Sequence, residues 1–219
     1  MLGFLIHAPV EHYARVSPGR PAMACQGAEV SYRDLDSASN QLANALIDRG
    51  LAPGDRVGIW MHKGLDLGTA IYGSLKAGGV FVPLDPFMPT ERLAFILEDC
   101  GIRHLVTSDL LVGRLDTMDP ALRPEIFGPD HESATSWDDV RTYPTSRPDT
   151  RLIDQDLGYI MYTSGSTGEP KGMMHTHHGS VSYARWGALH VGLESTDRVA
   201  SHALMGRQLP SGYAVIHGV

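Results

Sequence analysis

The strongest constraint on the fold of this chain is the regular alternation of short apolar runs with amphipathic segments over residues 31–107. The apolar runs have the length and composition of buried strands and cover 56–61, 80–84 and 104–107. The segments around them repeat apolar residues at helical spacing and cover 31–49, 65–75 and 89–100. Because short connections join strand to helix to strand, the pattern predicts an α/β fold, a mostly parallel sheet flanked by helices.

The remaining segments are less regular. Within residues 1–30 the sequence pattern predicts a short helix at 11–15 and two short strands at 22–25 and 28–32. Five prolines interrupt residues 108–150, which we interpret as an irregular surface excursion with one short helix and no domain of its own. Regular structure resumes with a strand at 157–162, a returning strand at 171–176 and a helix at 180–189.

Composition and charge exclude several classes of protein. The formal net charge of the 219 residues is -7, and no dense cluster of lysine and arginine is present, so a nucleic acid is not expected as a partner. No run approaches the roughly 20 apolar residues that span a bilayer, and the N-terminus lacks the pattern of a signal peptide. The two cysteines, Cys25 and Cys100, match no zinc spacing and suit a reducing compartment. We therefore expect a cytoplasmic protein with no membrane contact.

The segment from Tyr162 to Gly172 carries the strongest chemical signal. It follows a predicted buried strand and contains serine and threonine hydroxyls, glycines and one lysine, namely Thr163, Ser164, Gly165, Ser166, Thr167, Gly168 and Lys171. Glycines let backbone N–H groups approach a ligand, hydroxyls donate hydrogen bonds, and lysine adds a positive charge. Ligands of open α/β sheets bind beyond the carboxyl ends of the strands. The segment therefore predicts a site for the polyphosphate of a nucleotide.

Two alternatives compete with this interpretation. Serine-rich and glycine-rich turns are also common as flexible polar linkers, although a linker does not need Pro170, Lys171 and Gly172 at the start of the next strand. A Walker A loop requires G-x-x-x-x-G-K-[ST]. Counted from Gly165, Pro170 stands where the second glycine belongs, so that pattern fails.

Three blocks together resemble the adenylate-forming, AMP-binding superfamily, which contains acyl-CoA synthetases, adenylation domains of nonribosomal peptide synthetases and luciferases. Tyr162–Gly172 resembles the phosphate-binding signature of that family. Leu75–Pro86 resembles its "LKAGxxYVPLDP" block and Val30–Leu35 its "LTYxEL" opening. The resemblance covers about residues 10–200. The second block is closer to amino-acid adenylation domains than to fatty acyl-CoA synthetases.

The resemblance implies the N-terminal portion of the family's large domain and a two-step reaction. A carboxylate attacks the α-phosphate of ATP, with Mg²⁺ as the metal cofactor, to give an acyl-adenylate and pyrophosphate. The thiol of coenzyme A or of a carrier protein's phosphopantetheine then takes the acyl group. By resemblance, Thr163, Ser164, Ser166, Thr167 and Lys171 contact the β- and γ-phosphates. Gly165 and Gly168 shape the loop.

Other candidate residues receive structural interpretations. His175, His177 and His178 suggest a metal site by their number, but no cysteine or carboxylate completes a ligand set, so we expect structural or pocket-wall roles. The glycine-containing stretch 76–79 is expected to be a helix-to-strand turn and not a second phosphate loop.

Several family blocks are not found in the 219 residues. We find no adenine-binding "YGPTE"-like stretch, no "TGD" and no C-terminal block with the catalytic lysine, so the catalytic residues are unknown and residues 1–219 are interpreted as a partial AMP-binding domain without the C-terminal domain. Residues 203–219 form an atypical tail, and we hypothesise a truncated gene product, with a shifted frame over the tail. Three functions remain open: a carboxylate-activating ligase, a non-catalytic nucleotide-binding remnant, and a subunit that needs a second chain.

Overall fold

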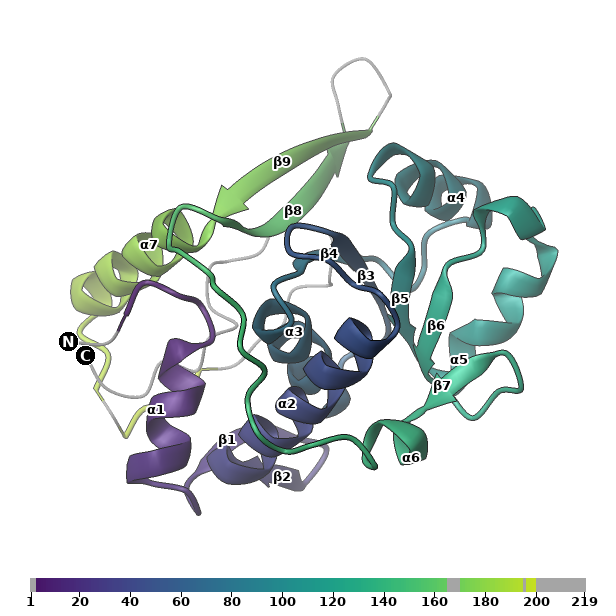
Figure 1. The fold of residues 1–219 in the computed structure, drawn as a ribbon. Coiled ribbons are helices and arrows are strands. Elements are labelled where there is room, and N and C mark those ends of the chain that lie inside the picture. The colour runs from purple at the N-terminus through teal and green to yellow at the C-terminus, as the bar shows by residue number, and fades with distance from the viewer. Residues whose placement is uncertain (1–2, 165–169, 195, 200–219) are drawn as a thin grey trace.

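A seven-stranded sheet forms the centre of the molecule, with helices on both faces (Figure 1). The computed structural model describes residues 3–164, 170–194 and 196–199. The strands lie in the order β7-β6-β5-β3-β4-β8-β9. Their bounds are β3 Arg56–Trp60, β4 Val80–Leu84, β5 His104–Thr107, β6 Glu125–Gly128, β7 Ala134–Ser136, β8 Leu157–Ser164 and β9 Pro170–Thr176. Among these strands every neighbouring pair is parallel except β8 and β9, which confirms the predicted mostly parallel sheet.

Helices cover both faces of the sheet and form one hydrophobic core on each face. The helices are α2 Tyr32–Asp48, α3 Asp66–Lys76, α4 Thr90–Asp99, α5 Asp109–Val112, α6 Trp137–Val140 and α7 His177–Val191. One core joins α2 and α3 to strand residues such as Val57 and Ile59. The other joins α4 and α5 to Trp60 and Leu105. Because successive strand residues point to opposite faces, each buried strand feeds both cores, which accounts for its near-continuous apolar sequence.

The ends of α2 and α3 follow signals that are present in the sequence. The Ser31 side chain accepts a hydrogen bond from the backbone N–H of Asp34, which is a helix N-cap. At the C-terminal end of α3 the chain passes through Ala77 and Gly78. The φ of +84° at Gly78 is unfavourable for residues with a Cβ, and β4 begins at Val80. Residues 76–79 are therefore the helix-to-strand turn that the sequence predicted.

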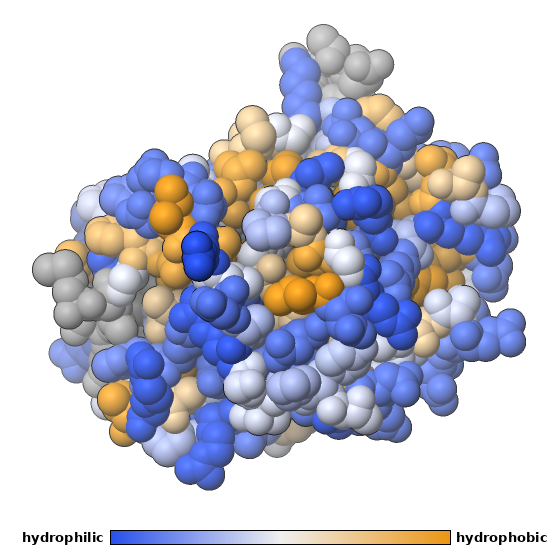
Figure 2. All heavy atoms as spheres, viewed as in Figure 1, coloured by the Kyte–Doolittle hydropathy of each residue, from blue (hydrophilic) through white to orange (hydrophobic). Residues whose placement is uncertain are grey.

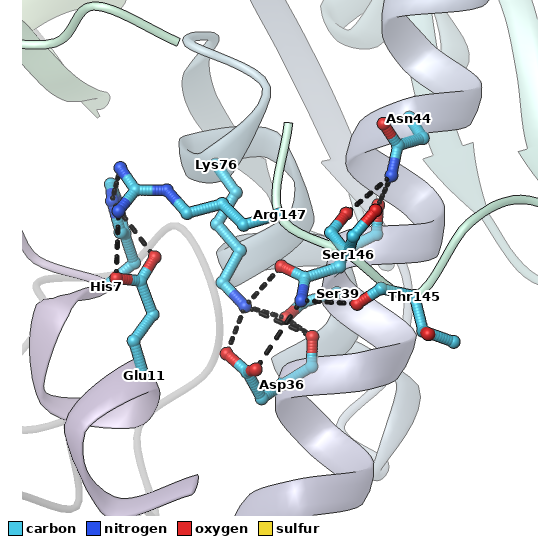
Figure 3. Close-up of polar contacts among 10 residues, drawn as sticks. His7, Glu11, Asp36, Ser39, Asn44, Lys76, Thr145, Ser146 and Arg147 are labelled. Atoms are coloured by element: carbon cyan, nitrogen blue, oxygen red, sulfur yellow. Dashed lines mark hydrogen bonds and ion pairs between the residues drawn. The ribbon is translucent and has the colours of Figure 1, made fainter. Parts of the chain in front are cut away.

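A buried charge joins α2 to α3. The Lys76 side chain is completely buried, and its Nζ lies 2.6 Å from Asp36 Oδ1, 2.8 Å from Ser39 Oγ and 2.9 Å from Asn40 Oδ1 (Figure 3). Burial lowers the pKa of Lys76, and the carboxylate of Asp36 counteracts that shift. The four side chains form one satisfied polar cluster inside the helix layer, as buried polar groups require.

Residues 108–150 differ from the predicted irregular excursion. They contain α5, two 3-10 turns (Gly113–Thr117 and Pro120–Leu122), α6, and the strands β6 and β7, which extend the central sheet. Phe127 on β6 is fully buried. The strands have only four and three residues, too few for a periodic pattern, and they form because β6 pairs with the edge of β5 and β7 with the edge of β6.

An extended segment after α6 crosses the outer surface of α2. The Asn40 amide donates to the carbonyl of Thr145 at 2.8 Å, and the Asn44 amide donates to the carbonyl of Ser146 at 3.0 Å (Figure 3). The Asn44 amide also donates to the carbonyl of Pro144 at 2.9 Å. These side-chain amides satisfy backbone groups that have no strand partner. The chain is thereby returned to the start of β8.

The N-terminal residues form a small separate layer beside α2. Helix α1 spans Ala8–Val16, and β1 Pro21–Cys25 pairs antiparallel with β2 Ala28–Ser31, so the predicted helix and two strands are present with slightly different ends. Cys25 and Cys100 are both free thiols. None of the described helices combines the length and apolarity needed to cross a membrane.

Candidate functional site

The candidate phosphate-binding segment lies between β8 and β9. Strand β8 lies beside β4 in the sheet and runs parallel to it, with Phe81 opposite Tyr159, and β9 returns antiparallel as the next strand. In Figure 1 the far end of this hairpin projects beyond the neighbouring strands. The predicted site therefore begins at the carboxyl end of a strand that runs with the parallel sheet, which is where such folds bind ligands.

The antiparallel pairing brings together residues that the sequence separates. Thr163 lies opposite Lys171, and Ser164 lies opposite Pro170. Directly opposite residues of an antiparallel pair point to the same face of the sheet, with Cβ atoms about 4.5–5.5 Å apart. The Thr163 hydroxyl and the Lys171 ammonium group therefore project on one face, and the Lys171 side chain is exposed. The predicted residues Gly165, Ser166, Thr167 and Gly168 lie outside the described residues, as does the tail 203–219.

Tyr162 anchors the end of β8 to helix α4. Its ring is buried in the core that contains α4 and α5. The Tyr162 hydroxyl donates to Asp99 Oδ2, and the Tyr162 hydroxyl oxygen lies 3.2 Å from Cys100 Sγ. Burial, followed by the hydrogen bond to Asp99, raises the pKa of Tyr162, so the phenol stays neutral. Burial also raises the pKa of the Cys100 thiol. Because the strand is fixed one residue before Thr163, the start of the candidate site is rigidly placed.

Gly172 permits close packing beside this anchor. A Cβ at Gly172 would lie 3.1 Å from Ile160 Cγ2 and 3.4 Å from Tyr162 Cζ. The first distance is tighter than ordinary van der Waals contact, so a Cβ here would require Ile160 to shift by a few tenths of an ångström. The glycine after Lys171 therefore belongs to the packing of the hairpin.

The three histidines after the hairpin contact three different neighbours. His175 stacks on Tyr159, with ring centroids 4.5 Å apart, and His177 Nδ1 accepts a hydrogen bond from the backbone N–H of Ile6 at 3.2 Å. His178 pairs with Asp154 at 3.0 Å. Within the described ranges no group of three or more histidine, cysteine or carboxylate side chains is placed to hold a metal ion. Each of the three rings therefore contacts a different part of the fold.

The loop after β4 is held by its own contacts. Trp60 Nε1 donates to the carbonyl of Asp85 at 3.2 Å, and Asp85 Oδ1 accepts from the backbone N–H of Phe87 at 2.9 Å. The Arg114 guanidinium donates to the carbonyl of Met88 at 2.6 Å and lies over the Trp60 ring at 4.9 Å. The "PLDP" block therefore shapes the carboxyl edge of the sheet beside β8.

Sequence reasoning did not find the contact of Tyr162 with Asp99. The two residues are 63 positions apart, and neither stands in a pattern that marks it as a partner of the other. Only the docking of α4 against β8 brings them together. The spacing of the buried strand residues predicted both elements but not how they are placed relative to each other.

The described part of the site is thus a mostly parallel sheet in which Thr163 lies opposite Lys171 near the end of β8. Comparison with known proteins gives the class. The family model described as AMP-binding enzyme matches residues 10–208, and the chain belongs to this family of adenylate-forming enzymes.

Relatives and solved structures agree with the assignment. Surfactin synthase subunit 1 of Bacillus subtilis (strain 168) is 32% identical over 212 residues, which are 92% of this chain and 6% of that protein. The anthranilate CoA ligase AuaEII, solved in complex with anthranoyl-AMP, superposes with a TM-score of 0.83 at 25% identity over 90% of this chain and 40% of its own. The N-terminal domain of FACL13 from Mycobacterium tuberculosis, solved with a bound inhibitor, gives 0.74 at 28% identity over 84% and 47%. The chain thus spans a small part of its curated relative and less than half of these structures.

Proposed function

We propose that this chain supplies the phosphate-binding hairpin of an AMP-forming ligase that activates a carboxylate with ATP. The observation that supports the proposal is the pairing of Thr163 with Lys171 at the end of β8. The exposed ammonium group adds positive charge where the polyphosphate of the nucleotide would lie, and the threonine hydroxyl adds a hydrogen-bond donor. Residues 1–219 would then be part of the family's large domain, in a cytoplasmic protein.

The ligands of the proposed reaction follow from family membership. ATP would lie with its β- and γ-phosphates against the hairpin, and Mg²⁺ would neutralise charge on the phosphate oxygens. The Lys171 side chain would hold the phosphates, and Thr163 would orient them. In such chemistry the protein acts mainly by positioning the reactants and stabilising charge.

The carboxylate is proposed to be an amino acid. The nonribosomal peptide synthetase FmoA3, solved with alpha-methyl-L-serine-AMP bound, superposes with a TM-score of 0.76 at 29% identity, and the 75–86 block resembles amino-acid adenylation domains more than fatty acyl-CoA synthetases. The anthranilate CoA ligase among the structural neighbours acts on an aromatic acid. An amino acid would transfer to a carrier phosphopantetheine and another acid to coenzyme A.

Carboxylate-dependent exchange of labelled pyrophosphate into ATP tests the proposal. The purified 219-residue chain is assayed with each proteinogenic amino acid and with a panel of aryl and acyl acids. Exchange above a no-carboxylate control supports a ligase. Nucleotide binding without exchange supports the non-catalytic remnant, and exchange regained only with another polypeptide supports the incomplete subunit. Absence of ATP binding under all these conditions rules out the phosphate-binding hairpin.

A further inference from the structure

The end of the β8–β9 hairpin extends beyond the strand that holds its base. The register between β4 and β8 consists of one pair, Phe81 opposite Tyr159, whereas β8 and β9 stay paired as far as Ser164, the last residue of β8. Residues 160–164 and their partners on β9 therefore form a two-stranded ribbon, which is marginally stable by itself in water. In the space-filling view the described end of the projecting hairpin is hydrophilic, and hydrophobic side chains lie at its base (Figures 1 and 2).

One side chain of the ribbon reaches back to the body of the molecule. Tyr162 is 6% exposed, and its hydroxyl donates a hydrogen bond to Asp99 Oδ2 on α4. On the partner strand Tyr162 lies opposite Gly172, where a Cβ would be 3.4 Å from the ring carbon Cζ. The backbone of β9 thus packs close to the ring beside Lys171, and Thr163 follows the ring directly on β8. Fixing the Tyr162 ring therefore fixes the backbone that carries both candidate phosphate ligands.

The acceptor of this hydrogen bond lies on a rigid support. Asp99 is the last residue of α4, and the carbonyl of the next residue, Cys100, accepts a hydrogen bond from Arg56 Nε on β3 at 2.5 Å. The backbone N–H of Ile102 donates to the carbonyl of Leu97 at 2.8 Å and closes the end of the helix. These contacts do not involve the hairpin. They place the Asp99 carboxylate independently, so it can orient the Tyr162 hydroxyl.

We propose that Asp99 is a positioning residue of the phosphate-binding hairpin. Through the Tyr162 hydroxyl it holds β8 and β9 in the arrangement that presents Thr163 and Lys171 to the nucleotide. In this role the carboxylate acts on the hairpin and touches no ligand. The inference rests on the proposed function, because it concerns the same site. The link between α4 and the hairpin is measurable without nucleotide, so its failure is distinguishable from failure of the proposed function.

The charge of Asp99 separates positioning from a general electrostatic effect. A carboxylate repels the phosphates of ATP, so removing its charge without any other change should strengthen ATP binding. If Asp99 positions the hairpin, Asp99→Ala should instead weaken ATP binding. Asp99→Asn also removes the charge, but it keeps an oxygen that can accept from the Tyr162 hydroxyl. The two variants therefore differ in the contact and not in the charge.

Hydrogen exchange of the full chain without nucleotide tests the link itself, on peptides that cover 157–164 and 170–176. Asp99→Ala and Tyr162→Phe should each speed exchange there about fivefold, because the ribbon loses its hydrogen bond to α4. Asp99→Asn should stay within about twofold of the unmodified chain. Glu98→Ala is the matched control, because Glu98 is exposed at the same end of α4 and its loss also removes one negative charge.

Titration with ATP·Mg²⁺ tests the consequence for the proposed site. Asp99→Ala and Tyr162→Phe should each weaken binding about fivefold. The double variant should bind no more weakly than the weaker single variant, because both changes break the same contact. Asp99→Asn should stay within about twofold of the unmodified chain, and Glu98→Ala should bind equally or more tightly.

The outcomes separate as follows. Faster exchange and weaker ATP binding in Asp99→Ala and Tyr162→Phe alone support the proposal. Exchange in Asp99→Ala equal to that in Glu98→Ala overturns it, as does an equal loss in Asp99→Asn and Asp99→Ala. If the unmodified chain binds no ATP, the proposed function fails, and the exchange result still decides whether Asp99 fixes the hairpin. Circular dichroism checks the fold of each variant, and Tyr162→Phe carries the test if Asp99→Ala does not fold.

Discussion

At the scale of single residues, the charge of Lys171 is the feature on which the proposed function depends most directly. Lys171→Ala should weaken ATP binding about tenfold or more, because a charge-assisted contact contributes about 1.5–3 kcal/mol and this side chain is exposed. Isothermal titration with ATP·Mg²⁺ measures the change. Lys171→Arg keeps the charge and should lose less, and Met173→Ala on the same strand should leave the affinity within twofold. Equal affinity in Lys171→Ala and the unmodified chain would remove the lysine from the site.

The residues of the candidate site were predicted from the sequence to different extents. The types and spacing of Thr163 and Lys171 predicted polyphosphate binding, and the structure places the two opposite each other. The support beneath them was not predictable, because Tyr162 reaches Asp99 and Cys100 only after α4 packs on the sheet. Local sequence carries the chemistry of a side chain, whereas its partners depend on contacts between distant elements.

At the scale of elements, the buried Lys76 determines how α2 and α3 are held together. Lys76→Met should destabilise the fold by about 2–4 kcal/mol, because removing one partner of a buried ion pair leaves the others without compensation. The lower end is expected because Asp36 keeps partial contact with solvent, at 24% side-chain exposure. Urea unfolding at pH 7.5 measures the loss.

The double variant Asp36→Asn with Lys76→Met separates charge from packing. It should recover part of the lost stability, because no uncompensated carboxylate then remains. Equal stability of Lys76→Met and the unmodified chain would show that the cluster contributes nothing net. The sequence predicts a turn at 76–79, and the turn is present. The burial of Lys76, its first residue, was not predictable, because it depends on the packing of α2 alongside.

At the scale of the whole molecule, buried histidines tie the N-terminal residues to α7. The His7 side chain is completely buried and lies edge-on to His177, which accepts a hydrogen bond from Ile6. Burial, reinforced for His7 by the Arg147 cation, lowers the pKa of both imidazoles, while Asp154 and Asp156 counteract the shift at His177. Figure 3 shows His7 with Arg147 and Glu11.

The sign of the pH dependence follows from these lowered pKa values. The unfolded chain binds more protons than the folded chain below about pH 6.5, so stability is complete above that pH and falls as the pH decreases. Between pH 7.5 and 6.0 a histidine that stays neutral in the folded chain costs at most about 0.8 kcal/mol. Burial raises the pKa of the neighbouring Glu11, which acts in the opposite sense at lower pH, so the measurement stays above pH 6.0.

Urea unfolding followed by tryptophan fluorescence at the two pH values checks the expectation. His177→Asn should reduce the drop, and the part that remains belongs to His7 and His175, whose pKa values burial also lowers. A drop of the same size in His177→Asn would mean that other groups titrate.

The sequence by itself determined the α/β class and the order of the first strands and helices, and it predicts polyphosphate binding for the Thr163–Lys171 segment, because periodicity and residue type are local properties. Only the tertiary structure decided that residues 125–128 and 134–136 join the sheet, that Lys76 is buried, and that α7 and β9 are left uncovered. Strands of three and four residues, buried charges and open surfaces depend on which distant segment lies alongside. No local pattern records that neighbour.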